Sequence, residues 1–157
     1  MDTDSEKLAS VCSFVSGTTG RILPPDIRDL AKKCLVDWFA VSLAALPDSA
    51  PTLVREQMRQ WKTHGHATNL YGDKGAAAAV ALVNGTLSHS LDFDDMHFGS
   101  AFHASGPTLA ATLAIGMHQN LSELEILNSF VTGFEVGTAM GDLGLGPSLA
   151  AAGWHPT

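Results

Sequence analysis

Aspartate and histidine side chains cluster in one short segment, residues 84–106, near the middle of the chain. The segment holds three carboxylates and three imidazoles: Asp92, Asp94, Asp95, His89, His97 and His103. Apolar, alanine-rich segments flank it on both sides, so we expect these ionisable groups at the edge of a buried core. Burial at such an edge perturbs acid–base behaviour and is typical of catalytic sites, which makes this segment the first candidate for chemistry.

Several interpretations of this segment stay open on the residues alone. Aspartate and histidine side chains are suited to general acid–base catalysis around a carboxylate substrate. The same side chain types bind divalent metals, so a metal-dependent all-α hydrolase is a second hypothesis; its ligands would be Asp92, Asp95, His97 and His103. In the third interpretation the segment is an ordinary polar loop, with Asp94 and Asp95 bonded to backbone N–H groups, in a non-catalytic helical remnant that dimerises.

Two features beside the cluster affect these interpretations. His89 lies in an apolar helical pattern, where a core histidine bonded to a backbone carbonyl is more common than a functional one. Ser105, Gly106 and Pro107 begin the next helix, and the N–H groups at such a start can hold an anion.

Helical patterns account for most of the chain and predict an all-α, multi-helix bundle. We expect helices over residues 4–16, 25–46, 52–63, 76–91, 105–118 and 122–140, an extended piece at 67–72, loops at 92–104 and 141–147, and one helical turn at 148–152. The alanine-rich helix 76–91 should be central and buried. Helix 25–46 becomes apolar all round after Asp37, and its second half should be buried on several sides.

Composition narrows the class of protein. The chain has 157 residues, 45% of them hydrophobic, and a net charge of −7 with no Lys/Arg cluster. This balance argues against nucleic acid and anionic membrane surfaces as partners. The sequence predicts a cytoplasmic protein, or a mitochondrial matrix protein if the source is eukaryotic. Cys12 and Cys34 lie in apolar patterns and are interpreted as buried free thiols.

Several motifs, in order, resemble the MmgE/PrpD family. They are Val83-Asn84-Gly85-Thr86, then His89-Ser90-Leu91-Asp92-Phe93-Asp94-Asp95, His103-Ala104-Ser105, Gly133-Phe134-Glu135-Val136 and Gly153-Trp154-His155-Pro156-Thr157. The family includes 2-methylcitrate dehydratase, cis-aconitate decarboxylase and iminodisuccinate epimerase. The resemblance implies an all-α domain, a small α+β domain later in the family's chain, a homodimer, and cofactor-free acid–base chemistry on a di- or tricarboxylate.

The resemblance also assigns roles to particular residues. Asp92, His103 and His155 match positions that line the family's active-site pocket and would be catalytic. Met96, His97 and Ser105 would contact the substrate, and no metal is implied. Among the family's reactions, dehydration of 2-methylcitrate ranks first, then decarboxylation of cis-aconitate, then epimerisation.

Length and charge predict that these 157 residues are only part of such an enzyme. Family members are about three times as long, and the later part supplies lysines to the active site as well as the small α+β domain. A polycarboxylate needs cations because burying unpaired carboxylates costs several kcal/mol (on the order of 5). With nine Lys and Arg and no cluster of them, residues 1–157 are expected to be a partial helical domain that is inactive alone.

Overall fold

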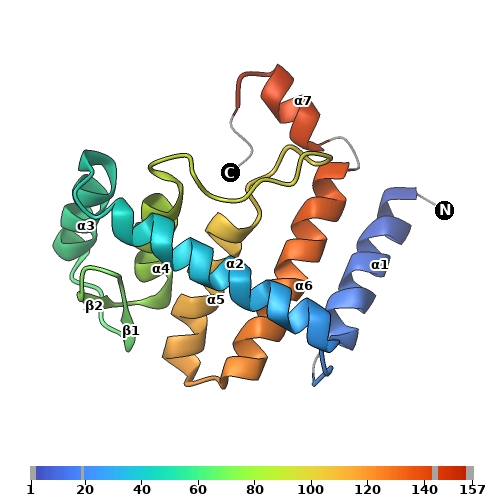
Figure 1. The fold of residues 1–157 in the computed structure, drawn as a ribbon, viewed down its shortest axis with the longest axis horizontal. Coiled ribbons are helices and arrows are strands. Elements are labelled where there is room, and N and C mark those ends of the chain that lie inside the picture. The colour runs from blue at the N-terminus through green and yellow to red at the C-terminus, as the bar shows by residue number, and fades with distance from the viewer. Residues whose placement is uncertain (1–2, 19, 143–144, 155–157) are drawn as a thin grey trace.

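The computed structural model describes residues 3–18, 20–142 and 145–154. Within these ranges the chain forms seven helices and one two-residue hairpin (Figure 1): α1 Thr3–Gly17, α2 Pro25–Ala44, α3 Ser49–Trp61, β1 Ala67–Thr68, β2 Lys74–Gly75, α4 Ala77–His89, α5 Ser105–Gln119, α6 Glu123–Asp142 and α7 Leu145–Ala151. The predicted all-α fold is confirmed, and the extended piece pairs with the following turn as β1 and β2, antiparallel.

Helix boundaries follow the capping signals in the sequence. Asp48 accepts a hydrogen bond from the Ser49 N–H at the start of α3. The Ser122–Glu125 capping box precedes α6: Glu125 accepts from the Ser122 N–H at 2.8 Å, and the Ser122 hydroxyl accepts from the Glu125 N–H at 3.4 Å. The predicted loop at 141–147 is wrong for most of its length, since α6 continues to Asp142 and α7 already begins at Leu145.

Helix α4 is central, as its alanine-rich sequence predicts. It packs along α5 and also contacts α2 and α3, and Figure 1 shows α2 crossing in front of this pair. Val80, Val83 and Leu87 of α4 are fully buried, because small neighbouring side chains let the helices approach closely. A second core cluster, which includes Trp38 and Phe130, joins α2, α5 and α6.

Two burial predictions are wrong. After Asp37, α2 buries only one face: Trp38 is 1% exposed, whereas Phe39 and Leu43 are 36% and 50% exposed. The apolar side chains on the other face of this part of α2 are therefore exposed, and no other helix of the described structure covers them. Both cysteines are free, but Cys12 is exposed and Cys34 is half-buried.

None of the helices in the described ranges combines the length and the hydropathy needed to cross a bilayer.

An ionic cluster attaches the β hairpin to α3. Arg55 Nε donates to Asp73 at 2.6 Å and Arg59 Nη2 donates to the same carboxylate at 2.7 Å. The hydrogen bond from Arg55 is the main reason that the pKa of Asp73 falls from its ordinary 3.8 to about 2. Because the folded-state pKa is the lower one, this stabilisation is present above about pH 4 and is lost as the pH falls towards 2.

We therefore expect Asp73→Asn to lower the free energy of unfolding at pH 7 by about 1–2 kcal/mol, less than the pKa shift alone would give, because Arg59 is half exposed and solvent screens its charge. The difference between wild type and variant should shrink between pH 4 and pH 2, as measured by urea unfolding. Glu123→Gln, which removes an exposed pair with Lys32, is the matched control and should change stability far less. A difference between wild type and Asp73→Asn that stayed constant over this pH range would contradict the assignment.

Candidate active site

The Asp/His segment forms the connection between α4 and α5. Helix α4 ends at His89, and Asp92 turns the chain with a left-handed backbone (φ 54°), which aspartate tolerates better than most residues. Residues 97–102 then fold back on themselves: His97 and Phe102 exchange backbone hydrogen bonds of 2.9 and 3.3 Å, and Ala101 also has a positive φ of 51°. In Figure 1 this connection lies on the same side of the molecule as α7.

Two imidazoles face one buried carboxylate. The Asp94 side chain is 2% exposed and lies 2.8 Å from His89 Nδ1 and 3.4 Å from His103 Nδ1. The two rings meet edge to face, with centroids 4.8 Å apart. A buried carboxylate needs hydrogen-bond donors, and an imidazole Nδ1–H supplies one. The His89 contact is a hydrogen bond, which directs the Nδ1–H of that ring to the ionised Asp94, whereas His103 Nδ1 lies at an ion-pair distance from the same carboxylate.

The Nε2 atoms face a second, exposed carboxylate. Asp92 Oδ1 lies 3.8 Å from His103 Nε2 and 4.0 Å from His89 Nε2, and the Asp92 side chain is 71% exposed. The imidazoles are thus bracketed by the buried Asp94 and the accessible Asp92. An Asp–His pair of this kind orients an imidazole so that its second nitrogen can accept or donate a proton.

A cavity of about 760 Å³ opens next to this cluster. Its lining residues come from the loop and from the end of the described chain: Asp92, Asp94, Met96, Ala101, His103, Ala150, Gly153 and Trp154. The volume suits a small organic ligand. Of the sequence-predicted site residues, Asp92, His103 and Met96 meet here, and His155 lies outside the described residues.

The other two predicted substrate contacts, Ser105 at the start of α5 and His97 in the loop, lie outside the cavity lining. The Ser105 N–H donates to Asp95 at 3.1 Å, and the Ser105 hydroxyl donates to the same carboxylate at 2.5 Å. Asp95 is therefore the anion at the start of α5, and it fixes the loop through a backbone N–H as predicted for this residue. His97 Nδ1 lies 2.9 Å from the Ser100 hydroxyl and 3.8 Å from Asp142, and neither Ser105 nor His97 lines the cavity.

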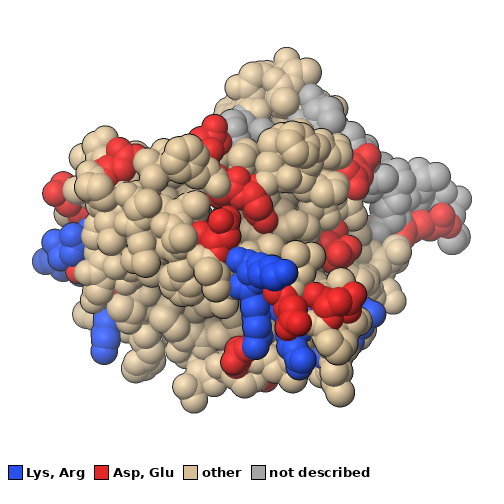
Figure 2. All heavy atoms as spheres, in the orientation of Figure 1, with Lys and Arg blue, Asp and Glu red and all other residues tan. Residues whose placement is uncertain are grey.

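The cavity is acidic on its described side. Two aspartates contribute to its lining and no lysine or arginine does among the residues that the structure describes. On the face drawn in Figure 2, lysine and arginine side chains lie in the lower half, and only acidic charges appear in the upper part, where Figure 1 places the loop and α7. A carboxylate ligand would need positive charge from a source other than these side chains.

Four side chains of the cluster could hold a divalent metal ion. His89, Asp92, Asp94 and His103 each offer one ligand atom, and these atoms lie within 4.8 Å of one another. Two imidazoles with carboxylates suit zinc and similar ions. This set differs from the predicted one, because Asp95 and His97 bond to Ser105 and Ser100 instead.

Cys34 of α2 is not suited to nucleophilic catalysis. Burial, followed by the negative charge of Asp95, raises the pKa of its thiol above the ordinary value. The reactive form of a cysteine is the thiolate, so a raised pKa keeps Cys34 in the unreactive form at neutral pH.

A row of glycines on α6 lets the loop and α5 pack closely against that helix. Gly133, Gly137 and Gly141 are four residues apart and share one face. A Cβ on Gly137 would lie 2.5 Å from the Phe102 ring, and one on Gly141 would overlap the Ser100 side chain and come within 2.9 Å of its carbonyl oxygen. The four-residue spacing of these glycines is visible in the sequence, but the close packing of the loop against them was not predicted.

Gly141→Ala should destabilise the protein by about 1–3 kcal/mol, because the new methyl group meets loop backbone that cannot rotate away. Gly17→Ala is the matched control: a Cβ there has no neighbour within 4 Å, and we expect little change in stability. Chemical denaturation of both variants measures the difference. Equal stabilities would show that the loop does not pack against α6 as described.

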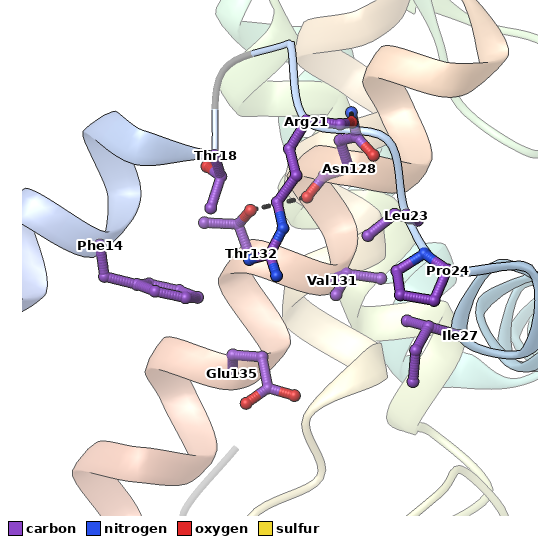
Figure 3. A pocket seen from close by; sticks show the side chains of 10 residues that line it. All are labelled: Phe14, Thr18, Arg21, Leu23, Pro24, Ile27, Asn128, Val131, Thr132 and Glu135. Carbon is purple, nitrogen blue, oxygen red and sulfur yellow. Dashed lines mark hydrogen bonds between the residues drawn. The ribbon is translucent and has the colours of Figure 1, made fainter.

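A second cavity, of about 300 Å³, lies between α1, residues 21–24, the start of α2 and α6 (Figure 3). Its lining is largely apolar, with Phe14, Leu23 and Val131 beside the polar ends of Arg21 and Glu135. Among the described residues its lining includes Glu135 as the one carboxylate and no histidine, which differs from the paired acid–base groups of the loop cavity.

Comparison with known proteins shows the family to which the chain belongs. Residues 9–157 match the MmgE/PrpD N-terminal domain, and the chain belongs to the MmgE/PrpD family. Among curated proteins, a cis-aconitate decarboxylase-like protein of Aspergillus oryzae is 25% identical over 155 residues, covering 94% of this chain and 32% of its own length. A cis-aconitate decarboxylase of Aspergillus terreus is 24% identical over 153 residues, covering 94% of this chain and 31% of its own length.

The chain therefore spans about a third of the length of the curated relatives it matches. No solved structure matches it significantly.

Proposed function

We propose that the protein is a lyase that acts on a small di- or tricarboxylate by proton transfer at a carbon next to a carboxylate group. The observation that carries this proposal is the Asp94–His103 pair beside the cavity: a buried carboxylate 3.4 Å from Nδ1 of an imidazole whose Nε2 faces the exposed Asp92. Catalytic hydrogen bonds are often long without a ligand and shorten when substrate binds. Membership of the MmgE/PrpD family supports the same class of reaction.

In this proposal each group has a defined part. His103 Nε2 gives or takes the proton, and Asp94 holds the ring so that Nε2 faces the cavity. Asp92, on the Nε2 side, is placed to stabilise the protonated ring or to exchange the proton with solvent. His155 stays a predicted third member outside the described residues.

The substrate should be tested as cis-aconitate first, because the matched curated proteins are named for it. Decarboxylation of cis-aconitate consumes one proton at carbon as CO₂ leaves, which is the step that His103 would serve. The order inferred from sequence put 2-methylcitrate first, and it becomes the second substrate to test. Epimerisation of a carboxylate at its α-carbon is the third.

The positive charge that a polycarboxylate needs is expected from polypeptide beyond residues 1–157 or from a second copy of the chain. This follows from the acidic lining of the cavity. A homodimer, the family's implied state, stays a prediction. Activity with protein expressed from the natural gene tests the function, and turnover by residues 1–157 alone would contradict the requirement for further cations.

A metal-dependent hydrolase is the second candidate, and the four-residue ligand set favours it. Stoichiometric zinc or manganese in the purified protein, lost in Asp92→Ala, would support this candidate. We expect instead that lyase activity survives prolonged dialysis against EDTA. Loss of turnover on dialysis and its recovery with added zinc would overturn the metal-independent mechanism.

A further inference from the structure

His89 contacts the catalytic pair from outside the substrate cavity. Its Nδ1 donates to Asp94 at 2.8 Å, whereas His103 Nδ1 lies 3.4 Å from the same carboxylate. His89 is absent from the lining of the 760 Å³ cavity. It lines a different cavity of about 540 Å³, together with Asp48, Thr86, Ser90 and Pro107. Substrate in the first cavity would therefore meet His103 and not His89.

We propose that His89 is a positioning residue: its hydrogen bond fixes the Asp94 carboxylate, and Asp94 in turn selects the His103 tautomer that presents Nε2 to the substrate. This inference rests on the proposed function of His103. An imidazole that donates to a carboxylate behind a functional group orients that group and sets which nitrogen carries the proton.

Burial and the local fold explain why Asp94 needs this second partner. The Asp94 side chain is 2% exposed, so water cannot hold its orientation. It follows the left-handed turn at Asp92, in a loop with no regular hydrogen-bond ladder around residue 94. His89, by contrast, lies in the last turn of the rigid helix α4. The hydrogen bond from His89 therefore ties the Asp94 carboxylate in the loop to the central helix α4.

The substitution series separates positioning from folding. In the protein expressed from its natural gene, His89→Ala should lower kcat about 10- to 100-fold with little change in KM. His89→Asn should recover most of the activity, because the asparagine side-chain N–H₂ can donate from nearly the position of Nδ1. Thr86→Ala is the matched control, since Thr86 lines the same 540 Å³ cavity but its hydroxyl donates to the Leu82 carbonyl rather than to Asp94.

Two further readouts make the test decisive. Free imidazole added to His89→Ala should enter the 540 Å³ cavity and restore activity saturably, which it would not do for a folding defect. With ¹⁵N-histidine labelling, the His103 ring signals should show Nδ1–H in the wild type and in Thr86→Ala, and a mixture of tautomers in His89→Ala.

The outcomes distinguish this inference from the proposed function. A wild-type kcat and an unchanged His103 tautomer in His89→Ala would overturn the positioning role, as would equal losses in His89→Ala and His89→Asn. If no carboxylate is turned over but the His103 tautomer still depends on His89, the positioning role stands and the lyase function falls.

Discussion

Replacing His103 by alanine should lower kcat/KM for cis-aconitate by about 10²- to 10⁴-fold in the protein expressed from its natural gene, the usual contribution of a positioned acid or base. The physical reason is that His103 is the imidazole that lines the cavity while resting on a buried carboxylate. Its side chain is only 10% exposed, which limits the freedom of the ring and shields the proton it carries from bulk water. The loss should lie mainly in kcat, measured by product formation under saturating substrate.

His118→Ala is the matched control for this variant. His118 is exposed near the end of α5 and stacks with His66, whose ring centroid is 6.4 Å away. We expect wild-type kinetics from it. A His103→Ala protein that kept more than about a tenth of the wild-type kcat/KM would exclude proton transfer by His103 as a major part of the mechanism.

Asp94→Asn should lower kcat by a similar factor, on the order of 10²–10⁴, although it only replaces one carboxylate oxygen by an amide nitrogen. The asparagine amide can donate to a ring nitrogen, which favours the tautomer that turns an N–H towards the cavity. Because the substitution preserves size, the fold should survive, which circular dichroism can confirm. Asp29→Asn on the exposed face of α2 is the matched control and should behave as wild type.

A double variant of Asp94 and His103 tests whether the two side chains act together. If Asp94 acts through His103, then Asp94→Asn combined with His103→Ala should be no slower than His103→Ala alone. Strictly multiplicative losses would mean that the two side chains act independently. That result would contradict the proposed pair while leaving each residue important.

Much of the fold was predictable because its determinants are local. The alanine-rich run of α4, the proline at the start of α2 and the Ser122–Glu125 capping box each specify a helix or its boundary within a few residues. Burial was harder to predict. An apolar residue such as Val36 has the same hydropathy whether a neighbouring helix covers it or not, and it is 69% exposed.

The site was predicted in outline but not in its pairings. The density of Asp and His in residues 84–106 located the loop, and Asp92, Met96 and His103 do line its cavity. Which carboxylate meets which imidazole depends on loop backbone, including the positive φ of Asp92 and Ala101, that no periodicity encodes. His89 was expected to be a core histidine bonded to a carbonyl, yet its Nδ1 bonds to Asp94 and its side chain is 26% exposed.

Two features of the sequence are related to the contacts that were not predicted, namely the His89–Asp94 pair and the packing of the loop on α6. His89 and Asp94 are five residues apart across a helix end, a separation that a left-handed turn at Asp92 can close. The four-residue spacing of glycines on α6 indicated a close approach by another segment. Neither signal identifies its partner, because the loop and α6 are far apart in sequence.

Exchange of carbon-bound hydrogen with solvent tests the central claim most directly, since dehydration, decarboxylation and epimerisation all move a proton at carbon. Protein expressed from its natural gene would be incubated in D₂O with cis-aconitate, and deuterium at carbon of the decarboxylated product would be followed by NMR. With 2-methylcitrate, whose dehydration removes a carbon-bound hydrogen, the disappearance of that hydrogen would be followed instead. We expect incorporation with the wild type and with His118→Ala, and its loss with His103→Ala. Incorporation by His103→Ala at the wild-type rate would contradict the assignment of proton transfer to this cluster.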